Sequence, residues 1–187
     1  AAAIDRTAET ERMPQMDENG KAIAPERHDI VFDHVSFAYE KKPILRDISV
    51  TLPDRSTTAI VGPSDSGKTT LCNLVARFWD ADSGSVRIGG HNVRDYTLES
   101  LMDQISMVFQ NVYLFADTIE NNIKFGCPNA THAQVVEAAK KACCDDFISA
   151  LPDGYATVIG EGGASLSGGE KQRISIARVF LKNPPIL

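Results

Sequence analysis

The chain has 187 residues, of which 43% are hydrophobic and 24% are charged, and its formal net charge is −6. This composition predicts a globular protein with one domain, or with one domain and a small subdomain. The basic residues form no run of the kind that binds nucleic acid, and no apolar run reaches the length of about 18 residues that a membrane-spanning helix needs. We therefore expect no nucleic-acid partner and no membrane span within these residues.

The cysteines show no zinc-binding pattern. No two of them have the CxxC spacing, and no histidines accompany them at the spacing of a zinc site. We expect them to be small buried side chains of a reduced protein. They are Cys72, Cys127, Cys143 and Cys144.

The first 28 residues are polar and contain two prolines, which favours a linker that follows the end of a helix. Residues 29–39 and 44–52 alternate between apolar and polar side chains, and they are predicted to be strands. Residues 57–61 form a short apolar run before Gly62, which is typical of a buried strand in a mixed or parallel sheet.

The pattern becomes helical after Gly67. Leu71, Leu74, Val75 and Phe78 lie at positions i, i+3, i+4 and i+7, which places one apolar stripe on a helix. The next predicted elements are a strand at residues 85–90, a short helix at 98–104 and a buried strand at 105–109.

Residues 117–151 have a helical pattern in which Thr131 and Gln134 form a capping box, and a helical subdomain is predicted at about residues 117–170. A last helix is predicted to begin at Ser167. It should end at Asn183, because the two prolines that follow cannot continue a helix.

Residues 62–70 have the spacing of a phosphate-binding loop. Gly62, Gly67, Lys68 and Thr69 satisfy the pattern GxxxxGK[ST]. The glycines let successive backbone N–H groups point inward, and the start of the following helix adds partial positive charge. The lysine would reach the outer phosphates, and the threonine hydroxyl would bind Mg²⁺. The alternative is a glycine-rich turn with a surface lysine, which the predicted strand and helix on either side disfavour.

Asp65 is unexpected within this loop, because a carboxylate that points into it would repel phosphate. Aspartate tolerates left-handed backbone, and its short side chain can turn to solvent. We therefore predict that Asp65 points away from bound phosphate.

A second candidate anion site lies in the sequence LSGGEKQR, residues 166–173. Ser167 with Glu170 three residues later forms a capping box, a feature that many helices share. Gly168 and Gly169 at the first two helical positions weaken a helix but leave bare N–H groups for an anion. The paired glycines favour an anion site over a plain helix cap.

Together the two motifs resemble those of the ABC (ATP-binding cassette) family, whose signature is LSGGQ. The resemblance covers residues 29–187 and includes VSFAY with Tyr39, VFQ with Gln110, and the exporter-type segments FADTIENNI and LPDGYATVIGEGG. Two residues depart from the family pattern: Asp65 replaces the usual loop glycine, and Glu170 replaces the usual signature glutamine.

The resemblance implies an α/β fold with a P-loop NTPase-like mixed or parallel sheet core, an antiparallel β subdomain and an inserted helical subdomain that carries the signature. It implies that residues 1–28 link the cassette to a transmembrane domain of the same polypeptide, at the cytoplasmic face of a membrane. Glu161 would then face that membrane domain.

The resemblance also implies that ATP and Mg²⁺ bind between two cassettes that pair head to tail, so that the P-loop of one and the signature helix of the other hold the same triphosphate. Lys68 and Gln110 would act in catalysis, and Thr69 and Gln110 would bind Mg²⁺. The residues implied to bind nucleotide are Tyr39, Gly62, Ser64, Asp65, Ser66, Gly67, Lys68, Thr69 and Thr70 in cis, and Ser167, Gly168, Gly169 and Glu170 in trans.

Hydrolysis needs an acid that orders Mg²⁺ and a group that activates water. The family places both after a strand that would begin near Ile186, and its switch histidine follows later, so we expect this chain to bind nucleotide but to hydrolyse it slowly. Two other functions stay open. One is a degenerate, regulatory cassette of an asymmetric pair, which Asp65 favours; the other is a DNA-associated ABC ATPase, which the short spacing between the two motifs disfavours.

Overall fold

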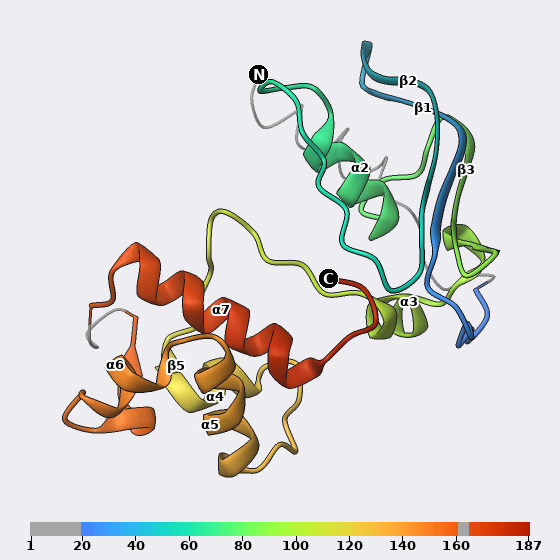
Figure 1. The fold of residues 1–187 in the computed structure, drawn as a ribbon. Helices are drawn as coiled ribbons and strands as arrows, with labels where there is room; N and C mark the ends of the chain where they lie inside the picture. The colour runs from blue at the N-terminus through green and yellow to red at the C-terminus, as the bar shows by residue number, and fades with distance from the viewer. Residues whose placement is uncertain (1–19, 161–164) are drawn as a thin grey trace. The chain divides into compact units, whose positions relative to one another are not determined.

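The computed structural model describes residues 20–160 and 165–187. The chain divides into two compact units, residues 1–105 and 106–187 (Figure 1). Residues 1–19 of the predicted linker and Glu161 lie outside the described residues. Of the helices that the structure does describe, none combines the length and the apolar character needed to cross a membrane.

A four-stranded antiparallel sheet forms the framework of the first unit. Its central strand is β1, which pairs with both β2 and β3. The register of β1 shifts after Phe32, where His34 has a φ of 52°, and this irregularity brings Phe32 and Val35 to the same buried face. The strands are β1 (Ile30–Tyr39), β2 (Lys42–Leu52), β3 (Ser83–Ile88) and β4 (His91–Asn92), in the order β2-β1-β3-β4. The strands predicted at residues 29–39, 44–52 and 85–90 are confirmed.

Within the described residues, two α-helices accompany this sheet, α2 (Lys68–Val75) and α3 (Leu98–Gln104), with the 3₁₀ turn η1 (Val93–Asp95) before α3. The predicted bounds of α3 are confirmed, and Thr97 caps it by accepting a hydrogen bond from the Ser100 amide. The helix α2 is shorter than its apolar stripe indicates, because Arg77 has a φ of 54° and ends the helical path before Phe78.

The described part of the predicted linker, residues 20–28, is hydrogen-bonded to other segments of the first unit. The Lys21 amide donates to the Asp95 carbonyl at 2.7 Å, and the Lys21 carbonyl accepts from the Thr97 amide at 2.9 Å. Further along, His28 Nε2 lies 3.1 Å from Gln104 Oε1 at the end of α3. This segment therefore runs beside η1 and α3.

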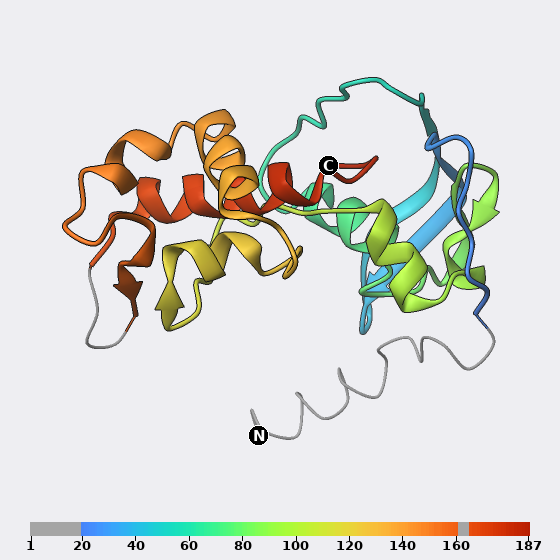
Figure 2. The same ribbon diagram turned by 90° about the horizontal axis from the view of Figure 1, so that it is seen from below.

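The second unit is mainly helical. Its elements are β5 (Asp117–Thr118), α4 (Ile119–Lys124), α5 (His132–Lys141), α6 (Asp145–Ser149), η2 (Gly154–Ala156), β6 (Val158–Ile159) and α7 (Gly168–Lys182). Both α4 and α5 pack against α7, as the turned view in Figure 2 also shows. The core includes Ile123, Val135, Ile148 and Ile174, each with no exposed surface.

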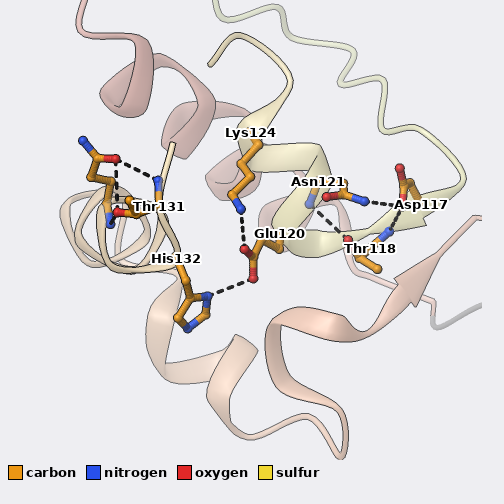
Figure 3. A network of polar contacts seen from close by, with 8 residues as sticks. Asp117, Thr118, Glu120, Asn121, Lys124, Thr131 and His132 are labelled. Atoms are coloured by element: carbon orange, nitrogen blue, oxygen red, sulfur yellow. Dashed lines mark hydrogen bonds and ion pairs between the residues drawn. The ribbon is translucent and has the colours of Figure 1, made fainter. Parts of the chain in front are cut away.

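Polar contacts at their starts join α4 and α5 (Figure 3). Glu120 on α4 contacts Lys124 Nζ at 2.6 Å with one carboxylate oxygen and His132 Nδ1 at 2.8 Å with the other. These contacts lower the pKa of Glu120, the hydrogen bond from Lys124 being the largest cause. The predicted capping box of Thr131 and Gln134 is confirmed at the start of α5.

The strands predicted at residues 57–61 and 105–109 are wrong. In the described residues neither segment belongs to a sheet, and Val61 is 87% exposed. A strand is stable only when a neighbour pairs with its N–H and C=O groups. The Ser106 amide does donate to the Ile186 carbonyl at 2.9 Å, but this single hydrogen bond does not make residues 105–109 a strand. The predicted parallel core is therefore not formed within the described residues.

The expectation that all four cysteines are buried is also wrong. Cys144 is fully buried, whereas Cys72 and Cys143 are exposed and Cys127 is half-buried. Burial raises the pKa of the Cys144 thiol to about 11, which keeps it protonated and unreactive at neutral pH.

Candidate phosphate-binding site

The start of α2 differs from that of every other described α-helix. It has neither a side-chain cap nor an acidic residue in its first turn, whereas each of the others has at least one of these. The first N–H groups of a helix have no partner within the helix and carry partial positive charge. In α2 these groups follow the glycine-rich loop, where an anion can reach them.

Gly67 is the N-cap residue of α2, and two features of its environment require glycine. Its φ is 88°, in the left-handed region. A Cβ atom at this position would lie 2.8 Å from Leu45 Cδ2 and 3.2 Å from Ile44 Cγ2. The loop therefore approaches β2 more closely than any other residue type would allow.

Lys68 reaches back over the loop that precedes it. Its Nζ donates to the carbonyls of Gly62 at 3.0 Å and Pro63 at 2.6 Å, and it lies 3.4 Å from Ser66 Oγ. The ammonium group is thus hydrogen-bonded to the loop, and Lys68 also lines the adjacent pocket, where it can pair with phosphate oxygens.

The loop borders a pocket of about 290 Å³, and Tyr39 forms part of its wall. The Tyr39 ring meets Phe37 and Trp79 edge to face, with centroids 4.8 and 5.5 Å apart. These contacts fix an aromatic ring beside the phosphate loop. The full lining is Tyr39, Lys42, Ile44, Asp65, Ser66, Gly67, Lys68, Thr69 and Thr70.

Asp65 adopts the left-handed backbone that we expected, with a φ of 62°. The residue is exposed, yet it also lines the pocket. Its orientation relative to bound phosphate therefore stays a prediction.

The second motif opens α7 with a complete capping box. Ser167 Oγ accepts from the Glu170 amide at 3.3 Å, and Glu170 Oε2 accepts from the Ser167 amide at 2.7 Å. The hydrogen bonds with Ser167 lower the pKa of Glu170, so the carboxylate is charged at neutral pH. The substitution of glutamate for the usual glutamine therefore keeps the cap.

Gly168 and Gly169 are exposed, and a Cβ at either position would meet no atom within 4 Å. Packing and backbone conformation therefore do not require glycine here, and alanine would favour the helix by about 1 kcal/mol at each position. A ligand that approaches the bare backbone from outside gives a physical reason for keeping both glycines.

The structure brings some of the predicted residues together in one pocket of the first unit, whereas others belong to the second unit. Tyr39 and residues 65–70 share the pocket, and Gly62 contacts Lys68. Ser64 is exposed in the same loop and is not part of the lining. Gln110 is exposed and belongs to the second unit, as do residues 167–170.

Three residues of this site were not predicted from the sequence: Lys42, Ile44 and Trp79. Lys42 pairs with Tyr39 across the β1–β2 turn, so the strand pairing of the predicted hairpin could have placed Lys42 and Ile44 beside Tyr39. No pattern in the sequence indicated that Trp79 would pack on Tyr39, because that contact depends on the path of the chain after α2.

A glycine-rich loop that opens onto an uncapped helix start, with a lysine folded over it, places this chain in the P-loop class of proteins. Residues 45–187 match the family model described as ABC transporter. The chain therefore belongs to the ABC transporter family.

The relatives include proteins of two bacteria. A "Putative multidrug export ATP-binding/permease protein" of Staphylococcus aureus strain NCTC 8325 is 53% identical over 160 residues, which cover 84% of this chain and 28% of that protein. A protein of the same description from Bacillus subtilis strain 168 is 50% identical over 163 residues, which cover 86% of this chain and 28% of that protein. This chain thus spans about 28% of the length of these relatives.

A solved structure described as "Structure of a bacterial Atm1-family ABC exporter with ATP bound" is 41% identical to this chain. The match has a TM-score of 0.89 and covers 99% of this chain and 33% of the exporter chain. The fold is therefore that of an ABC ATPase domain.

Proposed function

We propose that this chain is the ATP-binding domain of an exporter-type ABC transporter, in which ATP binding and hydrolysis drive the movement of a substrate across a membrane. The observation that carries the proposal is the uncapped start of α2 behind a glycine-rich loop. An unsatisfied helix start beside a lysine attracts a polyanion such as the triphosphate of ATP. The ATP-bound relative and the relatives named for multidrug export support the same function.

In this proposal the nucleotide base stacks on Tyr39 and its phosphates lie on residues 62–70, with Lys68 at the outer phosphates. Thr69 and Gln110 would hold Mg²⁺ through one hydroxyl and one amide oxygen, and nucleotide phosphates and water would supply the other ligands, as is usual for this ion. The described residues contain no cluster of three His, Cys, Asp or Glu side chains that could hold a metal on its own. A hydroxyl and an amide oxygen are donors that suit a hard cation such as Mg²⁺.

The proposed partner is a second cassette that binds head to tail. Its Ser167, Gly168 and Gly169 close over the γ-phosphate, with Glu170 maintaining the cap. The open space around both glycines supports this contact, because a phosphate can approach the backbone without meeting a side chain. A transmembrane domain of the same polypeptide, at the cytoplasmic face of a membrane, is the other proposed partner, since the named relatives are described as ATP-binding/permease proteins.

The proposal also includes the P-loop NTPase-like core of the cassette, although residues 57–61 and 105–109 form no strands in the structure. The alternative of a regulatory cassette without turnover depends on Asp65, and the named relatives lend it no support.

Nucleotide titration tests the proposal directly. The chain has one tryptophan, Trp79, whose ring lies 5.5 Å from Tyr39, so its fluorescence should respond when a base stacks nearby. We expect Lys68→Ala to weaken ATP binding by about tenfold or more, since it removes charge-assisted hydrogen bonds, and to affect AMP much less. Lys41→Ala, which removes an exposed lysine from the β1–β2 turn, is the matched control. Equal ATP affinities for the wild type and Lys68→Ala would overturn the proposal.

Asp65→Gly distinguishes the two kinds of cassette. Glycine accepts the left-handed backbone, so this variant removes the carboxylate without straining the loop. If Asp65 points to solvent, the affinity for ATP should change by only a few-fold. A gain of about a hundredfold would show that Asp65 obstructs binding, in favour of the regulatory alternative.

A further inference from the structure

The segment that contains Gln110 is held at both ends by α7. At one end, Gln172 Nε2 donates to the Phe109 carbonyl at 3.3 Å. At the other, Arg178 Nη1 donates to the Tyr113 carbonyl at 2.8 Å. Both donors belong to the helix that begins with the signature residues, and all of these groups lie in the second unit.

Arg178 makes further contacts that fix its position. Its Nε donates to the Asn122 carbonyl at 2.7 Å, and its Nη2 donates to Asn122 Oδ1 at 2.6 Å. Its guanidinium carbon lies 5.6 Å from the ring centroid of Phe115 and 5.8 Å from that of Phe125. The planar guanidinium thus uses its fork of donors to join α7, α4 and the segment after Gln110.

Asn122 completes this arrangement from α4. It is 1% exposed, its Oδ1 also accepts from the Phe115 amide at 2.9 Å, and its Nδ2 donates to the Phe115 carbonyl at 3.0 Å. A buried amide whose donors and acceptors are satisfied in this way specifies one conformation, because any other would leave polar groups without partners. The backbone of residues 113–115 is therefore fixed by side chains from two helices.

We propose that Gln172 and Arg178 are positioning residues that bind the Gln110 segment to α7, so that residues 109–113 and the signature helix move as one rigid element. The coupling to a partner's nucleotide, described next, rests on the proposed function. A partner's triphosphate bound at Ser167 would then alter the position of Gln110 through the body of α7. The two hydrogen bonds to Phe109 and Tyr113 carry this coupling.

Amide hydrogen exchange of the 187-residue chain tests the connection without nucleotide. We expect Arg178→Lys to speed exchange of amides 110–116 by about tenfold, the effect of losing a charge-assisted hydrogen bond to the Tyr113 carbonyl. Gln172→Ala should speed this exchange by about threefold, because the bond to the Phe109 carbonyl is neutral and exposed. Amides of α5 should change by less than about twofold. Lys140→Ala, which removes an exposed lysine from the same unit, is the control. Arg178→Lys keeps the charge, so it separates the loss of the fork geometry from the loss of a partly buried cation.

Two results would overturn the inference: amides 110–116 that exchange equally fast in the wild type and both variants, or a uniform rise in exchange across the whole unit, which indicates a purely structural role. A second arm uses ATP-driven self-association. In the wild type the dimer should protect amides 110–113, and in Gln172→Ala the dimer should form without that protection. Equal protection of amides 110–113 in both dimers would refute the coupling. If ATP produced no dimer at all, the proposed function would be refuted. The hydrogen exchange measured without nucleotide would then still decide whether Gln172 and Arg178 bind the Gln110 segment to α7.

Discussion

Replacing Gly168 and Gly169 by alanine should stabilise the fold and impair the function. Both residues lie in the first turn of α7, in open space and without a left-handed φ. Each substitution reduces the backbone entropy lost on folding, which is worth about 0.5–1 kcal/mol per residue. The double variant should therefore gain about 1–2 kcal/mol, and for a chain of this size each kcal/mol raises Tm by about 2–4 °C.

The methyl groups that this variant adds at positions 168 and 169 would occupy the space through which the proposed partner's phosphate reaches the start of α7. Losing one or two charge-assisted hydrogen bonds should weaken ATP-driven dimerisation by about tenfold or more. Sedimentation velocity in the presence of ATP measures the dimer, and Trp79 fluorescence measures nucleotide binding by the monomer, which should be unchanged. Gly126→Ala is the matched control, since a Cβ there would make only ordinary contacts with Lys182 at 3.7 Å or more.

The reasoning would be refuted if the double alanine variant dimerised as readily as the wild type. It would also be refuted if the variant lost stability, because that would show that packing or backbone conformation requires these glycines. A parallel loss of nucleotide affinity in the monomer would place the glycines in the cis site instead.

Three further predictions concern single positions. Gly67→Ala should destabilise the first unit by about 1–2 kcal/mol or more in urea unfolding and abolish the ATP response, because it adds left-handed strain to a 2.8 Å contact with Leu45. Cys143 should react with a thiol reagent in the native protein while buried Cys144 reacts only on unfolding; equal rates would contradict the burial described above. The pKa of Glu170 is lowered from its ordinary value of 4.5, so the charged Glu170 cap stabilises α7 at pH values above 4.5. This stabilisation is lost as the pH falls below 4.5 and the carboxylate is protonated. Glu170→Gln should therefore remove this part of the acid sensitivity in urea unfolding at pH 7 and pH 3, and an unchanged pH dependence would count against it.

The elements that the sequence predicted well are those whose signals are local. The alternation in β1 and the capping residues Thr131 and Ser167 depend on neighbours within a few positions, and the structure forms each of them where predicted. The phosphate-loop prediction also rests on local signals, because its glycines and lysine belong to one short segment, but its role in binding stays a prediction.

The failures depend on contacts between distant residues. Residues 57–61 have a strand-like composition, but a strand also needs a neighbour, and no pattern within the segment guarantees one. Asn122 and Arg178 were not singled out for the same reason. An asparagine in a short helix and an arginine in a longer one are ordinary residues until the fold brings them within 2.6 Å of each other.

The attachment of residues 20–28 has a practical consequence for anyone who shortens this chain. A boundary drawn at residue 29, where the strand pattern begins, would delete Lys21 and His28 together with their bonds to residues 95–97 and Gln104. It would also remove the β-bridge between Lys21 and Tyr96. A shortened version that begins at Gly20 keeps these contacts and is the better starting point for expression and crystallisation.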